Sequence, residues 1–200
     1  MTMKCPVCES TGISRKYRLR DRFFGVTAEE FDGFHCTGCR ALFLDPDLVR
    51  TRLAEFYPPN YWWSPGGWSG SLETGYREWV LRHDHLAFVK KALRGYENPK
   101  CLEIGCGSGS FLGLARREGI DIRGLELSAE AVERARAQGI EGIDVGTLDD
   151  AVKSGERFDA VIMFHLLEHL VDPREYMKKL AGILREGGCV ILQVPNLSSW

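Results

Sequence analysis

Residues 100–109 read KCLEIGCGSG, a short apolar run that passes into three closely spaced glycines. The run is bounded by turn-forming residues, which predicts a buried strand at 100–104, and a helix is predicted to follow at about 109–118. Glycines between a strand and a helix permit positive φ angles and let a ligand approach the backbone closely. The stretch therefore predicts a ligand-binding turn in an α/β fold.

Around this turn the chain alternates between short apolar segments and longer amphipathic ones. Further strands are predicted at 121–127, near 142–145, at 159–164 and at Cys189–Val194. Further helices are predicted at about Thr74–Leu93, at 129–138 and from Pro173 to about Arg185, with N-caps at Ser128 and Asp172. Gly187 and Gly188 are expected to end the last helix. Strands that alternate with helices predict a mostly parallel sheet with helices on both faces.

Two acidic residues stand at the ends of neighbouring predicted strands. Glu103 precedes the first glycine by two residues, where its charge would repel the pyrophosphate of a dinucleotide and attract the ammonium and sulfonium of S-adenosylmethionine. The turn also departs from G-x-G-x-x-G, because Ser110 replaces its last glycine. Glu126 is placed to accept two hydrogen bonds from a ribose diol, which both ligands carry. These acids favour S-adenosylmethionine over a dinucleotide; the alternative is a structural turn with a surface acid.

Four segments between residues 100 and 196 resemble the class I S-adenosylmethionine-dependent methyltransferases: EIGCGSGSF, GLELS, FDAVIMFHLLEHLVDP and LREGGCVILQVPN. The H-x-L-E-H motif in the third segment resembles the branch that acts on sugars, quinones and other small natural products. The resemblance implies a Rossmann-like, mostly parallel sheet with flanking helices and methyl transfer to a small-molecule acceptor. The alternatives are a ribosomal RNA methyltransferase and a non-catalytic cofactor-binding domain.

The same resemblance implies roles for individual residues. The methionine part of the cofactor would be lined by Glu103, Gly105, Cys106, Gly107 and Gly109. The nucleoside would be held by Glu126 at the ribose, Leu127 on the adenine, and the loop at Thr147 and Leu148. Phe164 and His165 would face the reactive methyl group.

Two histidines are candidates for a general base, which is needed only if the acceptor must lose a proton. His165 and His169 are four residues apart, so on a helix they would share a face. The alternative is that His165 only packs on the cofactor and that His169 caps or packs locally. The nearby sequence His83-Asp84-His85 is expected on a solvated helix, because these two histidines would point about 200° apart.

Two C-x-x-C pairs precede this region, at Cys5 and Cys8 and at Cys36 and Cys39. Four thiolates complete a tetrahedral zinc site without an open position, so the spacing predicts a structural zinc ion in a ribbon-like module. Redox or disulfide chemistry is the alternative.

The segment Ile13–Phe24 between the pairs alternates and predicts a strand. Its basic side chains suit RNA phosphates or a nucleotide-sugar diphosphate, or else form a solvated strand face: Lys16, Arg18, Arg20 and Arg22.

The sequence predicts three parts: a zinc-ribbon-like module at 1–56, an aromatic, Pro- and Gly-rich linker at 57–73, and the cofactor-binding domain at 74–200. The net charge of −2 gives no reason to expect non-specific nucleic-acid binding. We find no signal peptide and no run of about 18 apolar residues, and therefore expect a cytoplasmic protein without a membrane span. The resemblance implies further C-terminal strands, so the strand at Cys189–Val194 is expected to be an exposed edge, open to a homodimer or belonging to a truncated chain.

Overall fold

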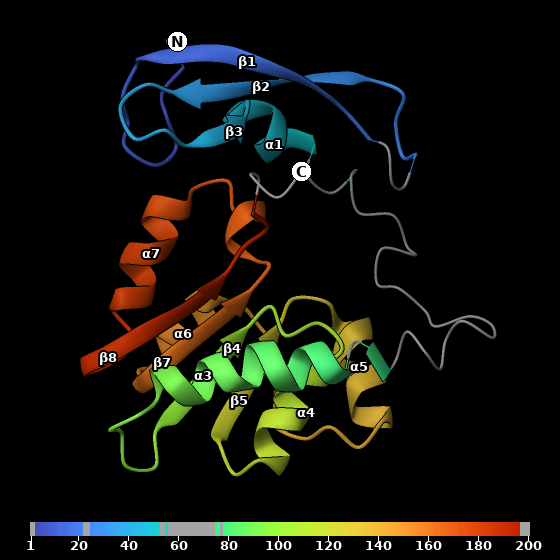
Figure 1. Ribbon diagram of the computed structural model, residues 1–200, viewed down its shortest axis with the longest axis vertical. Coiled ribbons are helices and arrows are strands. Elements are labelled where there is room, and N and C mark those ends of the chain that lie inside the picture. The colour runs from blue at the N-terminus through green and yellow to red at the C-terminus, as the bar shows by residue number, and fades with distance from the viewer. Residues whose placement is uncertain (1–2, 22–24, 53–54, 56–74, 77, 197–200) are drawn as a thin grey trace. The chain divides into compact units, whose positions relative to one another are not determined.

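The computed structural model describes residues 3–21, 25–52, 55, 75–76 and 78–196 (Figure 1). The predicted linker at 57–73 and Arg22 of the basic segment lie outside these residues. By its contacts the chain divides into two compact units. These are Met1–Trp63 with Leu170–Met177, and Ser64–His169 with Lys178–Trp200.

The first unit is built on a three-stranded antiparallel sheet in the order β1-β2-β3 (Figure 1). Its elements are β1 (Ile13–Arg20), β2 (Glu30–Cys36), β3 (Leu42–Leu44) and helix α1 (Pro46–Arg52). The predicted strand at Ile13–Phe24 is confirmed as far as Arg20. Almost every side chain of β1 is exposed, and only Gly33 and Cys36 of β2 are buried. This sheet therefore has little hydrophobic core of its own.

The second unit is a five-stranded parallel sheet in the order β6-β5-β4-β7-β8 (Figure 1). Its strands are β4 (Lys100–Ile104), β5 (Asp121–Glu126), β6 (Ile143–Val145), β7 (Phe158–Phe164) and β8 (Leu184–Gln193). Its helices are π-helix η2 (Leu81–Leu86), α3 (Ala87–Ala92), α4 (Ser110–Arg117), α5 (Ala129–Ala137), α6 (Leu148–Ser154) and 3₁₀-helix η3 (Leu167–His169). Helix α7 (Pro173–Ala181) is divided between the units, with its residues up to Met177 in the first and those from Lys178 in the second. The predicted α/β, Rossmann-like architecture is confirmed. Because the strand order reverses beside β4, a ligand crevice is expected at the carboxyl ends of β4 and its neighbours.

The core of this unit lies between the sheet and its helices. Strand β7 is an almost unbroken apolar run in which Ala160, Val161, Ile162 and Met163 are fully buried, as expected for a parallel strand that is covered on both faces. On α4, Leu112 is buried in the same cluster as Ile162. Burial of this kind holds β4 and β7 in fixed positions, and the glycine turn continues directly from β4.

One predicted boundary is wrong. The helix that begins at Pro173 ends at Ala181 rather than near Arg185, and β8 begins at Leu184 rather than Cys189. The register between β7 and β8 shifts between Phe158 and Ala160, which leaves extra residues on β8. Gly187, with a φ of 76°, lies in this irregular stretch. The two glycines therefore form a β-bulge, where positive φ favours glycine, and do not stop a helix.

Among the described residues, no helix combines the length and the apolar character that a bilayer crossing requires.

Candidate functional site

The turn after β4 depends on its three glycines. Gly105, Gly107 and Gly109 have φ angles of 74°, 53° and 69°, in the left-handed region that favours glycine. Space is restricted as well, since a Cβ atom on Gly105 would lie 3.2 Å from the methyl carbons of Leu166. The backbone N–H of Gly105 donates to the carbonyl of Leu125 at 2.8 Å, which ties the turn to β5. The turn therefore lies at the carboxyl end of β4, where its missing side chains let a ligand approach the backbone closely.

Glu126, the last residue of β5, stabilises this turn. Its Oε2 accepts a hydrogen bond from the backbone N–H of Gly107 at 2.8 Å, and its Oε1 accepts one from the N–H of Ser128 at 2.9 Å. Ser128 in turn caps α5 by accepting from the N–H of Ala131, as predicted. Each carboxylate oxygen has two lone pairs, so Glu126 retains capacity for two further donors. It links the turn, the end of β5 and the start of α5.

Glu103 is buried in β4, with 4% of its surface exposed, and its Oε2 has no hydrogen-bond partner among the described residues. Burial, and then the negative charge of Glu126, raise the pKa of the Glu103 carboxyl to about 8. An unpaired buried carboxyl oxygen is costly, and a cationic donor would satisfy it. The site therefore has an unmet requirement for a hydrogen-bond donor beside the glycine turn.

Cys106 packs beneath the turn. A Cβ atom on Gly124 of β5 would lie 2.8 Å from the Cys106 sulfur, so the two residues fit only because Gly124 has no side chain. Burial, and then the charge of Glu103, raise the pKa of the Cys106 thiol. The thiol stays protonated and acts as a small apolar group rather than a nucleophile.

The predicted adenine-side residues differ in exposure. Leu127 follows β5 and is 75% exposed, so its side chain is available to a ligand. Thr147 and Asp150 form the capping box of α6, with the Thr147 hydroxyl donating to the Asp150 carboxylate at 2.7 Å. Leu148 is buried, so its side chain contributes to the core.

The two candidate bases lie on different kinds of backbone. His165 has a φ of 52°, a strained value for a residue other than glycine, and its N–H donates to the carbonyl of Gln193 at 2.9 Å. Its half-exposed ring has Nδ1 3.6 Å from Oε1 of Glu168. His169 ends the short helix η3, which begins after His165. His165 therefore lies outside the helix, and the condition under which the two histidines would share a face is not met.

The structure adds His85, which the sequence analysis placed on a solvated helix. His83 is exposed, but His85 is only 9% exposed. Its ring packs edge-on against Phe164, with centroids 4.6 Å apart, and lies 6.4 Å from the ring of His165. The signal that could have found it is spacing, because His85 stands four residues after Leu81 and four before Val89, on the apolar stripe of the helix.

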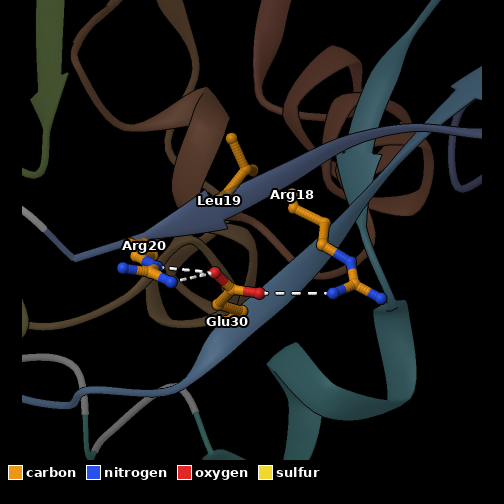
Figure 2. A pocket seen from close by; sticks show the side chains of 4 residues that line it. All are labelled: Arg18, Leu19, Arg20 and Glu30. Carbon is orange, nitrogen blue, oxygen red and sulfur yellow. Dashed lines mark hydrogen bonds and ion pairs between the residues drawn. The ribbon is translucent and has the colours of Figure 1, made fainter.

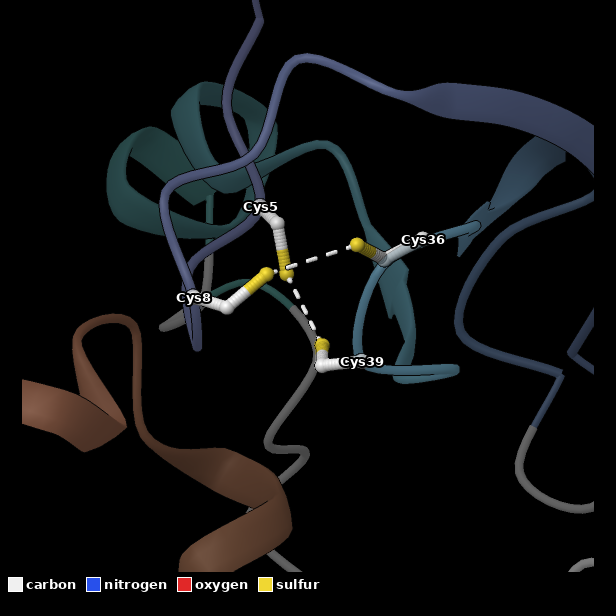
Figure 3. A group of neighbouring side chains, drawn as sticks. All are labelled: Cys5, Cys8, Cys36 and Cys39. Atoms are coloured by element: carbon white, nitrogen blue, oxygen red, sulfur yellow. Dashed lines mark hydrogen bonds between the residues drawn. The ribbon is translucent and has the colours of Figure 1, made fainter.

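The four predicted zinc ligands come together in the first unit (Figure 3). The sulfurs of Cys5, Cys8, Cys36 and Cys39 all lie within 4.8 Å of one another. Two of the separations are 3.6 Å, from Cys5 to Cys39, and 3.5 Å, from Cys8 to Cys36. Thiolates bound to a tetrahedral zinc ion at ~2.3 Å lie ~3.8 Å apart, whereas a disulfide needs ~2.05 Å. The arrangement fits a metal site and excludes disulfides in this structure.

The two cysteine turns have the same backbone geometry. The carbonyl of Cys5 accepts from the N–H of Glu9, and the carbonyl of Cys36 accepts from the N–H of Arg40, both at 2.9 Å. Glu9 and Arg40 have φ angles of 63° and 66°. A donated hydrogen bond from the backbone of Cys39 is the main cause that lowers the pKa of Cys36 to about 6. This hydrogen bond favours the thiolate form of Cys36, whereas the pKa of Cys39 in the same turn is raised to about 12.

The basic side chains of β1 are largely paired. Figure 2 shows the pocket at Arg18, Leu19 and Arg20, in which both arginines face Glu30 of β2. The Arg20 Nε donates to Glu30 at 2.6 Å, and the Arg18 guanidinium does so at 3.4 Å. Arg15 pairs with Asp32 at 3.3 Å. This face is a mixed-charge surface rather than a run of free positive charge.

Comparison with known proteins identifies relatives of the parallel-sheet unit. The sequence profile of a family described as a methyltransferase domain matches residues 75–200. The ubiquinone biosynthesis O-methyltransferase of Alkalilimnicola ehrlichii is 33% identical over 142 residues, which are 68% of this chain and 55% of that protein. The protein of the same name from Pectobacterium carotovorum is 27% identical over 158 residues, 76% of this chain and 64% of that protein. The chain thus spans less than two thirds of the length of these relatives.

Two solved structures are also similar in part. An S-adenosylmethionine-dependent methyltransferase from Clostridium acetobutylicum has a TM-score of 0.49 and 17% identity, over 62% of this chain and 56% of that chain. One from Archaeoglobus fulgidus has a TM-score of 0.43 and 26% identity, over 57% of this chain and 55% of that chain.

The family match at residues 75–200 covers more than half of the chain, and includes the glycine turn, both buried acids and the H-x-L-E-H motif. The chain therefore belongs to the methyltransferase domain family.

Proposed function

We propose that the chain binds S-adenosylmethionine at the carboxyl ends of β4 and β5 and transfers its methyl group to a hydroxyl of a small molecule. The observation that carries the proposal is the unpartnered Oε2 of Glu103, buried beside a turn of left-handed glycines. An ammonium group supplies the missing donor and a compensating charge, which a pyrophosphate cannot do. The relatives named as ubiquinone biosynthesis O-methyltransferases support a quinone-like acceptor, and the H-x-L-E-H motif supports the small-molecule branch.

Different residues would bind different parts of the cofactor. Glu103 binds the ammonium end of the cofactor, with Gly105, Cys106, Gly107 and Gly109 along its methionine part. Glu126 uses its remaining lone pairs on the ribose, and exposed Leu127 packs on the adenine beside the loop at Thr147 and Leu148.

S-adenosylmethionine supplies an already activated methyl group, so the protein mainly aligns the acceptor. Phe164 and His165 lie at the carboxyl end of β7, beside β4. His165, held near Glu168, is placed to take the acceptor's proton, and His169 is a second candidate.

Calorimetric titration of the full chain with S-adenosylmethionine and with NAD tests the proposal. We expect the wild-type chain to bind S-adenosylmethionine and not NAD. Glu103→Gln keeps the shape of the side chain but removes its charge, and should weaken binding about 30-fold or more. Glu133→Gln, an exposed glutamate on α5, is the matched control and should change the affinity less than about twofold. Failure of the wild-type chain to bind, or preferential binding of NAD, contradicts the proposal.

We also propose that Cys5, Cys8, Cys36 and Cys39 hold a structural zinc ion, with residues 1–56 forming a zinc-ribbon-like module ahead of the linker at 57–73 and the cofactor-binding domain at 74–200. Four sulfur ligands leave no open position, so the ion would stabilise the module rather than act in chemistry. The pairing of Arg18 and Arg20 with Glu30 favours a small-molecule acceptor over RNA for the chain.

A further inference from the structure

Two buried side-chain atoms have no hydrogen-bond partner among the residues that the structure describes, Oε2 of Glu103 and Nδ1 of His85. The first is explained by the proposed cofactor. Nδ1 of His85 has no role in the proposed binding of the cofactor or in the proposed methyl transfer. Native proteins pair nearly all their buried polar atoms, so an orphan nitrogen in a 91% buried residue points to a missing ligand.

His85 lies at the same end of the sheet as the cofactor site. Its ring packs edge-on against Phe164, at an interplanar angle of 82°, and Phe164 ends β7. Strand β7 pairs in parallel with β4, with Glu103 opposite Ile162. The imidazole therefore lies near the carboxyl end of β7, next to the strand that carries Glu103, and it forms one cluster with the rings of Phe111 and Phe164.

The backbone around His85 is unusual. Residues Leu81–Leu86 form a π-helix, which holds one more residue per turn than the α-helix that follows. Both His85 and Leu86 are buried, although they are consecutive, and Val89 continues the buried face. π-helical turns are rare and occur frequently at functional sites.

Burial is the main cause that lowers the pKa of His85. Two titratable groups face it: Asp84 on its own helix favours the protonated ring, and His165 at the end of β7 opposes it. The backbone of Val80 and the side chain of Gln193 on β8 are polar neighbours of the ring that also favour protonation less strongly than burial opposes it, but neither meets Nδ1 with hydrogen-bond geometry. At neutral pH the ring is uncharged, so it can both donate and accept a hydrogen bond.

We propose that His85 belongs to the methyl-acceptor site and hydrogen-bonds a phenolic hydroxyl of the acceptor. The inference rests on the proposed function, because it assumes that a methyl donor is bound beside Glu103. The aromatic surroundings of His85, formed by Phe111 and Phe164, suit a hydroxyl carried on an aromatic ring. Nδ1 is covered in this structure, so the proposal requires the imidazole to turn about its Cβ–Cγ bond when the acceptor enters.

Three variants of the full chain separate a hydrogen-bonding role from a packing role. His85→Leu removes both ring nitrogens and keeps an apolar group. His85→Asn places an amide near the position of Nδ1 and so retains a hydrogen-bonding group. His83→Leu is the matched control, since His83 lies on the same turn and is exposed. The probe is catechol, with methyl-labelled S-adenosylmethionine as donor, and the readout is label in the methylated phenol.

We expect His85→Leu to lower kcat/KM for catechol about 30-fold or more, His85→Asn to stay within about fivefold of wild type, and His83→Leu to be unchanged. Calorimetric affinity for S-adenosylmethionine should stay within about twofold in all three variants. In the wild-type chain kcat/KM should fall at acid pH, since protonation of His85 removes its accepting lone pair, and because burial lowers the pKa of His85 this loss should lie below the ordinary range of a histidine. The amide of His85→Asn does not titrate, so this part of the acid limb should disappear in that variant.

Several results would overturn the inference. Equal losses in His85→Leu and His85→Asn would assign His85 to packing, and full activity in His85→Leu would remove it from the site. Loss of donor affinity in His85→Leu would place it in the donor site instead. A wild-type chain that binds the donor but does not methylate catechol contradicts the phenolic acceptor alone. A wild-type chain that binds no donor contradicts the proposed function itself.

Discussion

The two units of this chain differ in how many apolar side chains they bury. In the parallel-sheet unit, apolar side chains such as Leu112, Val132 and Ile162 are fully buried. In the described part of the antiparallel unit, the buried core residues are Cys5 and Cys36. A hydrophobic core contributes in proportion to buried area, whereas a four-thiolate site contributes through one bound ion. The contrast supports the proposal that a bound zinc ion, rather than an apolar core, stabilises the small antiparallel sheet.

The largest expected effect is therefore metal removal. Cys36→Ser, or a strong chelator, should unfold the antiparallel unit, because structural zinc sites bind with about 10–16 kcal/mol that the fold cannot replace. Zinc content should fall from one ion per chain to none, and hydrogen exchange of the amides in β1–β3 should become fast. Cys189→Ser, outside the cluster, is the control. Unchanged exchange after chelation would show that the two units do not differ in this way.

The converse prediction concerns the hydrophobic core. Leu112→Ala should destabilise the parallel-sheet unit by about 2–5 kcal/mol, because a fully buried side chain leaves a cavity. Leu19→Ala on β1, where the side chain is 44% exposed, should change stability by less than about 0.5 kcal/mol. Urea unfolding followed by domain-specific hydrogen exchange measures both. Similar losses at the two sites would contradict the contrast between the units.

A smaller effect is expected from the pH dependence of the parallel-sheet unit. The folded pKa of Glu103 is raised to about 8 from a reference of 4.5, so the folded state binds its proton more tightly than the unfolded state. Its contribution is fully present below pH 4.5 and is lost as the pH rises towards about 8, by a few kcal/mol at most. Glu103→Gln should remove this loss, so the variant should unfold at a higher temperature than wild type at pH 8.5, without bound cofactor. The opposite order would mean that Glu103 is charged and satisfied in the folded protein.

Much of the fold was predictable because its signals are local. The glycines after β4, the cap at Ser128 and the apolar run of β7 each specify their own conformation. The bulge at Gly187 was not predictable, because it depends on the register between β7 and β8, which residues far apart in the sequence determine. The clustering of the four cysteines was predictable from their sequence, because two C-x-x-C pairs have the spacing of metal ligands.

The candidate site was predictable in part for the same reason. Glu103 and Glu126 follow from their positions at strand ends, but the pairing of Glu126 with the amides of Gly107 and Ser128 needed the structure. The spacing of His85 from Leu81 and Val89 indicates its burial, but the π-helical turn that also buries the adjacent Leu86 needed the structure.

During synthesis, β4, β5 and β6 leave the ribosome before β7 and β8, although β4 lies at the centre of the finished sheet. One edge of β4 therefore stays unpaired until β7, which begins at Phe158, has been synthesised. The site at the carboxyl ends of β4 and β7 cannot form before then. Pairing between segments so distant in sequence is slow to form. We expect nascent chains that end before β7 to expose an apolar edge and to depend on chaperones.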